Sequence, residues 1–275
     1  MSRRLRAHIW LPLFAYAIGM FMLLPILWLL ISAFRPEYDI VSAPYSLPEK
    51  LTLGNFTQLL QLPGFVSSVR NSFLVALLAT AFTAGVALPT GYLVSRYSFP
   101  GRVFFRSLAI IGYLFAPAVL ALPYLQILSR VGLIDSLAGI VFTHVAFCLP
   151  FSLSLVDLIF RSVPISLEQV AMLDGSGLRV RLWRVLVPVT RFQIGGLMLL
   201  VFTISWKEFF FAFLVSSSVG TRTLPVLLAM LYGGEALNWH LLCALSVVIV
   251  LPSLFLLFWG KWSEVVPLLG AGTRG

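Results

Sequence analysis

The chain runs repeatedly through long apolar stretches that are separated by short polar segments. A helix needs ~20 mostly apolar residues to cross a hydrocarbon core of ~30 Å. We predict membrane helices over 11–34, 68–95, 105–128, 138–160, 192–217 and 239–260. Since 60% of the 275 residues are hydrophobic and 11% are charged, the chain carries more apolar surface than a soluble fold of this length can bury. The sequence therefore predicts an all-α membrane protein with about six transmembrane helices.

The distribution of arginine and lysine predicts the orientation of these helices, because positive side chains near a span are retained on the cytoplasmic side. One set of connections holds most of them: Arg3, Arg4, Arg6, Arg96, Arg102, Arg106, Arg161, Arg179, Arg181, Arg184, Arg191, Lys261 and Arg274. The opposite connections hold Arg35, Lys50, Arg70, Arg130 and Arg222. We therefore expect both termini in the cytoplasm. This asymmetry accounts for the net charge of +9 without nucleic-acid binding.

Three parts are expected along the chain. Residues 1–67 hold the first span and an external loop with a short helix around 54–60, residues 68–262 hold the other spans, and 263–275 form a cytoplasmic tail. The first apolar run is too long for a signal peptide, so we expect an uncleaved span.

The sequence predicts no catalytic or metal site. Cys148 and Cys243 fall inside predicted spans, and His144 and His240 have no second ligand at metal spacing. The Gly-Ser-Gly at 175–177 does not form the Gly-x-Ser-x-Gly turn of a hydrolase.

The polar connection 161–191 differs from the other connections because it has helical signals of its own. Ser166 is predicted as an N-cap with Gln169 as its capping-box partner, and Gly175 after Asp174 is predicted to end the helix. A second, amphipathic segment follows, and Pro188 is predicted to end it. Its apolar face is Leu178, Leu182, Val185 and Leu186, opposite Arg179, Arg181 and Arg184. Two interpretations stay open: helices lying on anionic headgroups, or docking of the first helix into a groove of a partner.

One motif in this connection resembles the cytoplasmic EAA loop of ABC-importer permease subunits. The string E-x-x-A-x-x-x-D-G, followed by aliphatic-x-aliphatic-Pro, is carried by Glu168, Ala171, Asp174, Gly175, Val185, Val187 and Pro188. Val170 and Val187 depart from the usual Ala and Leu. Segments 25–36, 71–102, 149–164 and 205–215 also resemble carbohydrate-type permeases of the maltose-transporter kind, whereas the tail after 262 follows them only loosely.

This resemblance implies a type I ABC importer permease in a bacterial or archaeal cytoplasmic membrane, for a sugar or sugar-like solute. Such a subunit pairs with a second, related permease on two cytoplasmic ATP-binding subunits, and an extracytoplasmic solute-binding protein delivers the solute. The resemblance assigns ATPase coupling to Glu168, Ala171, Asp174, Gly175 and Pro188. The chain has no G-x-x-x-x-G-K-[ST] phosphate loop, so ATP and Mg²⁺ are expected on the partner subunits, with no cofactor or ATP hydrolysis in this chain.

Charged residues interrupt the fifth predicted span. A charged Asp, Lys or Arg near the centre of a span costs ~2.5–3.5 kcal/mol, so such residues mark functional sites. We hypothesise that Trp206, Lys207 and Glu208 line the translocation pathway. The alternative is that Lys207 pairs with Asp157 or Glu208 and stabilises helix packing.

Two other classes of membrane protein remain as alternatives. A secondary, ion-coupled transporter would usually show paired inverted repeats with discontinuous helices, and no such pairing is evident in the sequence. The other class is a membrane scaffold or enzyme.

Overall fold

The computed structural model describes residues 2–44, 46, 48, 50–107, 117–234 and 237–259. Within these ranges the chain is helical and has no strand, as predicted. The predicted tail 263–275, with Arg274, lies outside the described residues, as does Lys261. The chain forms two compact units, one from Met1–Phe65 with Leu228–Leu251 and the other from Val66–Leu227 with the chain from Pro252 onward. The predicted division at residues 67 and 262 stays a prediction.

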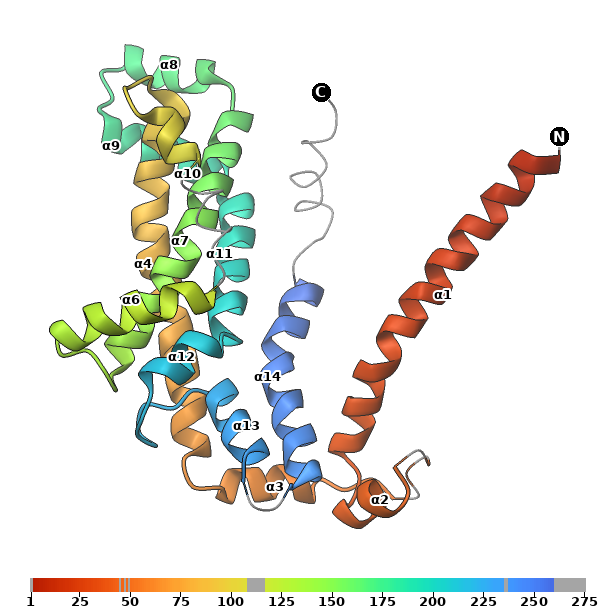
Figure 1. Ribbon diagram of the computed structural model, residues 1–275. Coiled ribbons are helices and arrows are strands. Elements are labelled where there is room, and N and C mark those ends of the chain that lie inside the picture. The colour runs from red at the N-terminus through yellow and green to blue at the C-terminus, as the bar shows by residue number, and fades with distance from the viewer. Residues whose placement is uncertain are drawn as a thin grey trace. The chain divides into compact units, whose positions relative to one another are not determined.

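The first unit begins with α1 (Ser2–Ala33), α2 (Glu37–Ser42) and α3 (Gly54–Gln61), shown in red and orange in Figure 1. The buried Arg35 donates to the carbonyl oxygens of Asp39 at 2.9 Å and Ala43 at 2.8 Å, and so satisfies the C-terminal end of α2. Asn55 on α3 donates to the carbonyl oxygens of Ala33 and Arg35, each at 2.8 Å. These bonds hold the described part of the loop that is predicted after the first span. The helix predicted around 54–60 is present, and α2 was not predicted.

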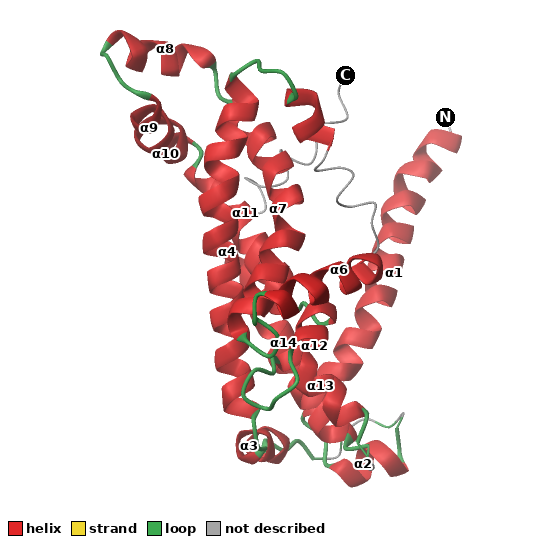
Figure 2. Ribbon diagram, turned by 60° about the vertical axis from the view of Figure 1, so that its left-hand side comes forward, coloured by secondary structure: helices red, strands yellow, loops and turns green. Residues whose placement is uncertain are grey.

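The second unit is built around α4 (Phe65–Arg96), α7 (Leu137–Ser162) and α11 (Arg191–Trp206), which run side by side in Figures 1 and 2. Tyr92, Val156, Phe160 and Val201 are buried between them. A Cβ atom added at Gly91 would lie 2.4 Å from Cγ1 of Val156. The glycine therefore permits the close approach of α4 to α7.

The described helices match the predicted spans to different degrees. Three segments are long and apolar enough to cross a membrane alone: Tyr16–Ala33 within α1, α4, and α7. The third predicted span overlaps α6 (Pro117–Arg130), and 108–116 lie outside the described residues. The fifth is divided between α11 and α12 (Phe210–Val215), and the sixth is α14 (Trp239–Trp259).

Asp135 connects two loops at the end of the second unit that is distant from α8. Its backbone has φ of 54°, which is uncommon for a residue other than glycine. Its Oδ1 accepts hydrogen bonds from the backbone N–H groups of Ser217 and Ser218, each at 2.9 Å, and from the hydroxyl of Thr221. These bonds hold the pKa of Asp135 well below its usual value, because they stabilise the charged form. The loop before α7 is thereby fixed to the loop between α12 and α13 (Leu224–Tyr232).

Candidate functional site

A short helix, α8 (Ile165–Leu173), follows α7 and lies at the end of the α4–α7–α11 bundle, in green at the top of Figure 1. It begins directly after Pro164, whose φ of −57° already suits a helix start. The predicted N-cap at Ser166 is wrong, since Ser166 lies within the first turn and the N-terminus has no side-chain cap. The fixed backbone of the proline starts the helix earlier than the capping pattern indicated.

At its C-terminal end, α8 is terminated by the turn at Gly175, as predicted. The N–H of Gly175 donates to the carbonyl oxygen of Met172, and the N–H of Ser176 donates to that of Ala171, each at 3.0 Å. This is the Schellman arrangement, which requires a left-handed residue after the C-cap. Gly175 supplies it with φ of 75°, directly after Asp174. The helix therefore has a defined length.

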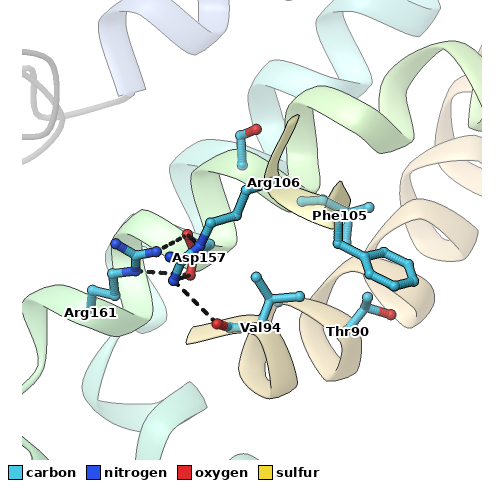
Figure 3. Close-up of a pocket in the computed structure, with 9 residues that line it drawn as sticks. Thr90, Val94, Phe105, Arg106, Asp157 and Arg161 are labelled. Atoms are coloured by element: carbon cyan, nitrogen blue, oxygen red, sulfur yellow. Dashed lines mark hydrogen bonds and ion pairs between the residues drawn. The ribbon is translucent and has the colours of Figure 1, made fainter. Parts of the chain in front are cut away.

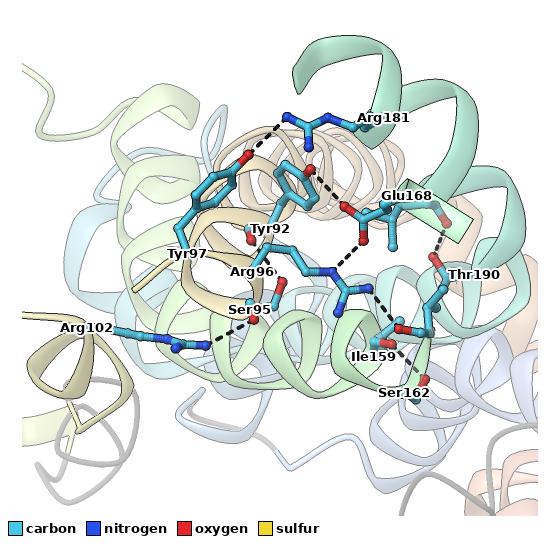
Figure 4. Close-up of polar contacts among 12 residues, drawn as sticks. Tyr92, Ser95, Arg96, Tyr97, Arg102, Ile159, Ser162, Glu168, Arg181 and Thr190 are labelled. Atoms are coloured by element: carbon cyan, nitrogen blue, oxygen red, sulfur yellow. Dashed lines mark hydrogen bonds and ion pairs between the residues drawn. The ribbon is translucent and has the colours of Figure 1, made fainter. Parts of the chain in front are cut away.

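Glu168 attaches α8 to the end of α4, as Figure 4 shows. Its side chain is 2% exposed. Its Oε1 accepts a hydrogen bond from Nε of Arg96 at 2.5 Å, and its Oε2 accepts one from the hydroxyl of Tyr92 at 2.9 Å. Arg96 also donates from Nη2 to the carbonyl oxygen of Val163 at 2.9 Å. One arginine thus holds both the start and the first turn of the loop helix.

The opposite face of α8 is apolar and uncovered. Leu167, Val170 and Leu173 are 45%, 61% and 88% exposed. Ala171 is half-buried and Asp174 is exposed. Because Glu168 points inward, the chain presents an apolar helix face at this end.

The second half of the loop is helical but irregular. It comprises α9 (Leu178–Val180), the π-helix η1 (Arg181–Leu186) and α10 (Val187–Val189). Pro188 lies inside α10, and the helical segment ends at Val189, one residue later than predicted. Just before this proline, the N–H of Val187 donates to the carbonyl oxygen of Leu182, the i to i+5 spacing of a π-helix. The break comes at Thr190, where this segment meets α11 at 85°.

The predicted polar face of that second segment is only partly correct. Arg179 and Arg184 are exposed, but Arg181 is 9% exposed and donates from Nη2 to the hydroxyl of Tyr97 at 3.1 Å. On the predicted apolar face, Leu182 and Leu186 are buried, whereas Leu178 is 43% exposed. Arg181 therefore attaches this segment to the residues just after α4.

The second candidate site lies in the break between α11, which ends at Trp206, and α12, which begins at Phe210. Trp206 is buried at the last residue of α11, and Lys207 and Glu208 occupy the break. The carboxylate of Glu208 accepts the backbone N–H groups of Phe211 at 3.0 Å and Ala212 at 3.1 Å. Glu208 therefore satisfies the start of α12.

Glu208 also contacts a buried histidine on α7. Nε2 of His144 lies 3.0 Å from Oε2 of Glu208, and Nδ1 of His144 lies 2.7 Å from Oγ of Ser205. The side chain of His144 is 1% exposed. This cluster joins α7 to the break in the fifth span.

Lys207 differs from its neighbours because it is exposed. The proposed pairing of Lys207 with Asp157 or Glu208 is wrong, since both carboxylates bind other groups. Asp157 forms ion pairs with Arg106 and Arg161, at 3.2 and 2.8 Å. At the break, Lys207 is therefore exposed, whereas the neighbouring Glu208 contacts partners inside the bundle.

No protein-family model matches the chain. A putative ABC transporter permease protein of Streptomyces antibioticus is 34% identical over 209 residues, which cover 76% of this chain and 91% of the relative. The chain belongs to the ABC transporter permeases. The trehalose/maltose transport system permease protein of Thermococcus litoralis is 28% identical to the permease over 266 residues, covering 92% of it and 91% of the relative.

The fold of the permease matches a solved chain with a TM-score of 0.76 at 20% identity, covering 94% of this chain and 96% of that one. That chain is from a bacterial ABC transporter involved in import of the acidic polysaccharide alginate. The predicted all-α importer-permease fold is thereby confirmed. The alternative of a secondary transporter finds no support in these relatives, which are transport permeases.

Sequence reasoning missed the residues of the permease that hold α8. Tyr92 and Arg96 are four residues apart, on one face of the last turns of α4. A tyrosine hydroxyl and an arginine guanidinium on the same helix face can both donate to one carboxylate, and this is the signal that the sequence offers. That signal gives no indication that the partner is Glu168.

Proposed function

We propose that this permease forms half of the translocation pathway of an ATP-driven importer and that α8 docks into a cytoplasmic ATP-binding subunit. The observation that carries the proposal is the orientation of α8. Glu168 fixes one face to α4, and the apolar side chains of Leu167, Val170 and Leu173 are left exposed on the other. An apolar helix face of this kind fits a hydrophobic groove on a partner protein.

The proposed coupling requires that movement of α8 reaches the membrane helices. A slack connection would absorb such movement. Here α8 is bonded to α4 through Arg96 and Tyr92, and its C-terminal end is fixed at Gly175. Asp174 and Pro188 are exposed on the same loop, where a partner can reach them. Closing of two ATP-binding subunits would then rotate α4 together with α8.

The remaining parts of the proposal follow from the relatives. One relative is a trehalose/maltose transport system permease, which favours a sugar or sugar-like solute here. A second solved structure of similar fold is a bacterial alginate ABC transporter in complex with a periplasmic protein that holds an alginate pentasaccharide. This complex supports a solute-binding protein as partner. A second, related permease would complete the pathway, and ATP with Mg²⁺ would bind the two ATPase subunits. Both termini and α8 would face the cytoplasm.

Purification of the permease from its native membrane tests this function. We expect a nucleotide-binding subunit to co-purify in stoichiometric amounts. Leu173→Asp places a charge on the exposed face of α8 and is expected to remove that subunit. Val131→Asp is the matched control, because Val131 is 59% exposed in the loop after α6. Retention of the nucleotide-binding subunit by Leu173→Asp would contradict docking through α8.

A further inference from the structure

A pocket of about 290 Å³ opens beside the bundle, near the end that carries α8. Its walls come from α4, the helical turn 102–107 and α7. As Figure 3 shows, charged groups gather on one side of it and apolar groups on the other. Arg106, Asp157 and Arg161 form the charged side, Phe105 lies on the other side, and the lining also includes the apolar side chains of Val94 and Leu153. None of these residues belongs to the EAA motif, which begins at Glu168, or to the break in the fifth span.

The two arginines hold Asp157 unequally. Arg161 binds it with two well-directed hydrogen bonds, from Nε to Oδ1 at 3.0 Å and from Nη2 to Oδ2 at 2.8 Å. Arg106 approaches it more loosely, with Nη2 3.4 Å from Oδ1 and Nε 3.2 Å from Oδ2, and its Nη2 also donates to the carbonyl oxygen of Val94 at 3.3 Å. Nε of Arg106 is buried and makes no hydrogen bond of good geometry with the described residues. The carboxylate of Asp157 is therefore used mainly by Arg161, and the charge of Arg106 remains available.

Neighbouring arginines do not share this role. Arg102 donates to the backbone carbonyl oxygens of Val94 and Ser95, at 2.8 and 3.0 Å. Arg96 is bound to Glu168. The side chain of Arg106 is 31% exposed and that of Arg161 is 42% exposed, so an anion can reach both from outside. The pocket thus carries one net positive charge, on a guanidinium whose acceptors all lie 3.2 Å or more away.

We propose that this pocket binds the phosphate of a phospholipid headgroup, with Arg106 as its principal ligand. Guanidinium groups recognise phosphate oxygens through charge-assisted hydrogen bonds, and basic pockets between membrane helices bind anionic headgroups. Free phosphate shares this chemistry. The apolar wall of Val94, Phe105 and Leu153 favours the lipid, because it can contact the glycerol and the first methylene groups of an acyl chain, which free phosphate lacks. The volume fits a headgroup but not a whole lipid.

The proposal is independent of docking by α8, and its test measures lipid binding rather than transport. The full-length permease, purified with its partner subunits in a neutral detergent, is titrated with short-chain phosphatidylglycerol while its thermal unfolding is followed. Parallel titrations use phosphatidylcholine and inorganic phosphate. We expect phosphatidylglycerol to raise the midpoint of unfolding, with half-saturation at the lowest concentration of the three ligands.

Two variants and one control locate the site. Arg106→Gln is expected to weaken phosphatidylglycerol binding roughly ten-fold, since it removes one charge-assisted contact. Arg130→Gln removes an exposed arginine at the end of α6 and is expected to leave binding unchanged. Ser154→Phe keeps every charge and fills the pocket from α7, and it is also expected to reduce binding. Normal binding by both Arg106→Gln and Ser154→Phe overturns the site, and inorganic phosphate that binds as tightly as phosphatidylglycerol overturns the lipid assignment.

Discussion

Arg96 and Glu168 are separated by 72 residues of chain, and their charged groups form a buried ion pair at the junction of α4 and α8. The side chain of Arg96 is 8% exposed and that of Glu168 is 2% exposed. Such a pair fixes the geometry of two elements more than it adds net stability, because both charges lose their hydration. At this position the pair joins the loop helix to a membrane helix.

Removal of one partner of this pair should separate α8 from α4. In Glu168→Gln the charge of Arg96 is left buried without its carboxylate, which costs about 3–5 kcal/mol for a buried pair. We expect a lower midpoint of thermal unfolding and loss of transport-coupled ATP hydrolysis. Asp174→Asn is the matched control for thermal unfolding only, since Asp174 is an exposed acid on the same loop and its variant should unfold at almost the wild-type midpoint. Normal ATPase coupling in Glu168→Gln would show that the pair does not transmit movement.

The two loop glycines allow a test of the stop at the end of α8. Gly175 has φ of 75°, whereas Gly177 has φ of −69°, and a Cβ atom at either position meets no neighbour within 4 Å. Gly175→Val should therefore destabilise the loop by ~1–2 kcal/mol through backbone strain alone. Gly177→Val should have little effect. Protease cleavage in the loop 173–178, followed over time, measures the difference, and equal cleavage of both variants would contradict it.

Gly91 and Gly85 form a similar matched pair within α4. A Cβ atom at Gly91 would lie 2.4 Å from Val156, whereas one at Gly85 meets nothing within 4 Å. Gly91→Ala should separate α4 from α7 and destabilise the protein by ~1–3 kcal/mol, as overpacked cores do. Gly85→Ala should be neutral or slightly stabilising, since alanine favours helix. Thermal unfolding of the two variants in one detergent compares them, and a Gly91→Ala protein as stable as Gly85→Ala would argue against close packing at this point.

Local signals in the sequence predicted those parts of the structure that depend on neighbouring residues. The stop at Gly175 and the break after Trp206 were predicted because a glycine turn and adjacent charges interrupt helices by themselves. The predicted cap at Ser166 was wrong, because the helix begins directly after Pro164, and the end predicted at Pro188 was displaced by one residue to Val189. The pairing of Glu168 with Arg96 was not predicted, because no local rule selects one partner among several arginines. Long-range pairing of this kind depends on how α4 and α7 pack.

Acid should loosen the loops that Asp135 holds together. The pKa of this carboxylate is lowered in the folded state, so its contribution to stability is present above the usual pKa of 3.8 and is lost as the pH falls below it. At neutral pH the Asp135→Asn variant should imitate the acidified protein. We expect faster protease cleavage at 216–223 in Asp135→Asn, and a smaller increase in Thr221→Val, which removes one of the donors. Unchanged cleavage in Asp135→Asn would show that the loops are fixed by other contacts.

Lys207 offers the sharpest test of the proposed pathway, because it is exposed in the break while Glu208 is held by His144 and by the start of α12. If solute passes this break, Lys207→Asn should change the apparent affinity or the rate of uptake several-fold without lowering thermal stability, since no partner is lost among the described residues. Glu208→Gln should instead lower stability, because it weakens the contact with His144 and the cap of α12. Uptake of labelled solute into proteoliposomes, measured beside thermal unfolding, separates the two effects. Wild-type uptake in Lys207→Asn would remove Lys207 from the pathway and leave the break as a purely structural feature of the fifth span.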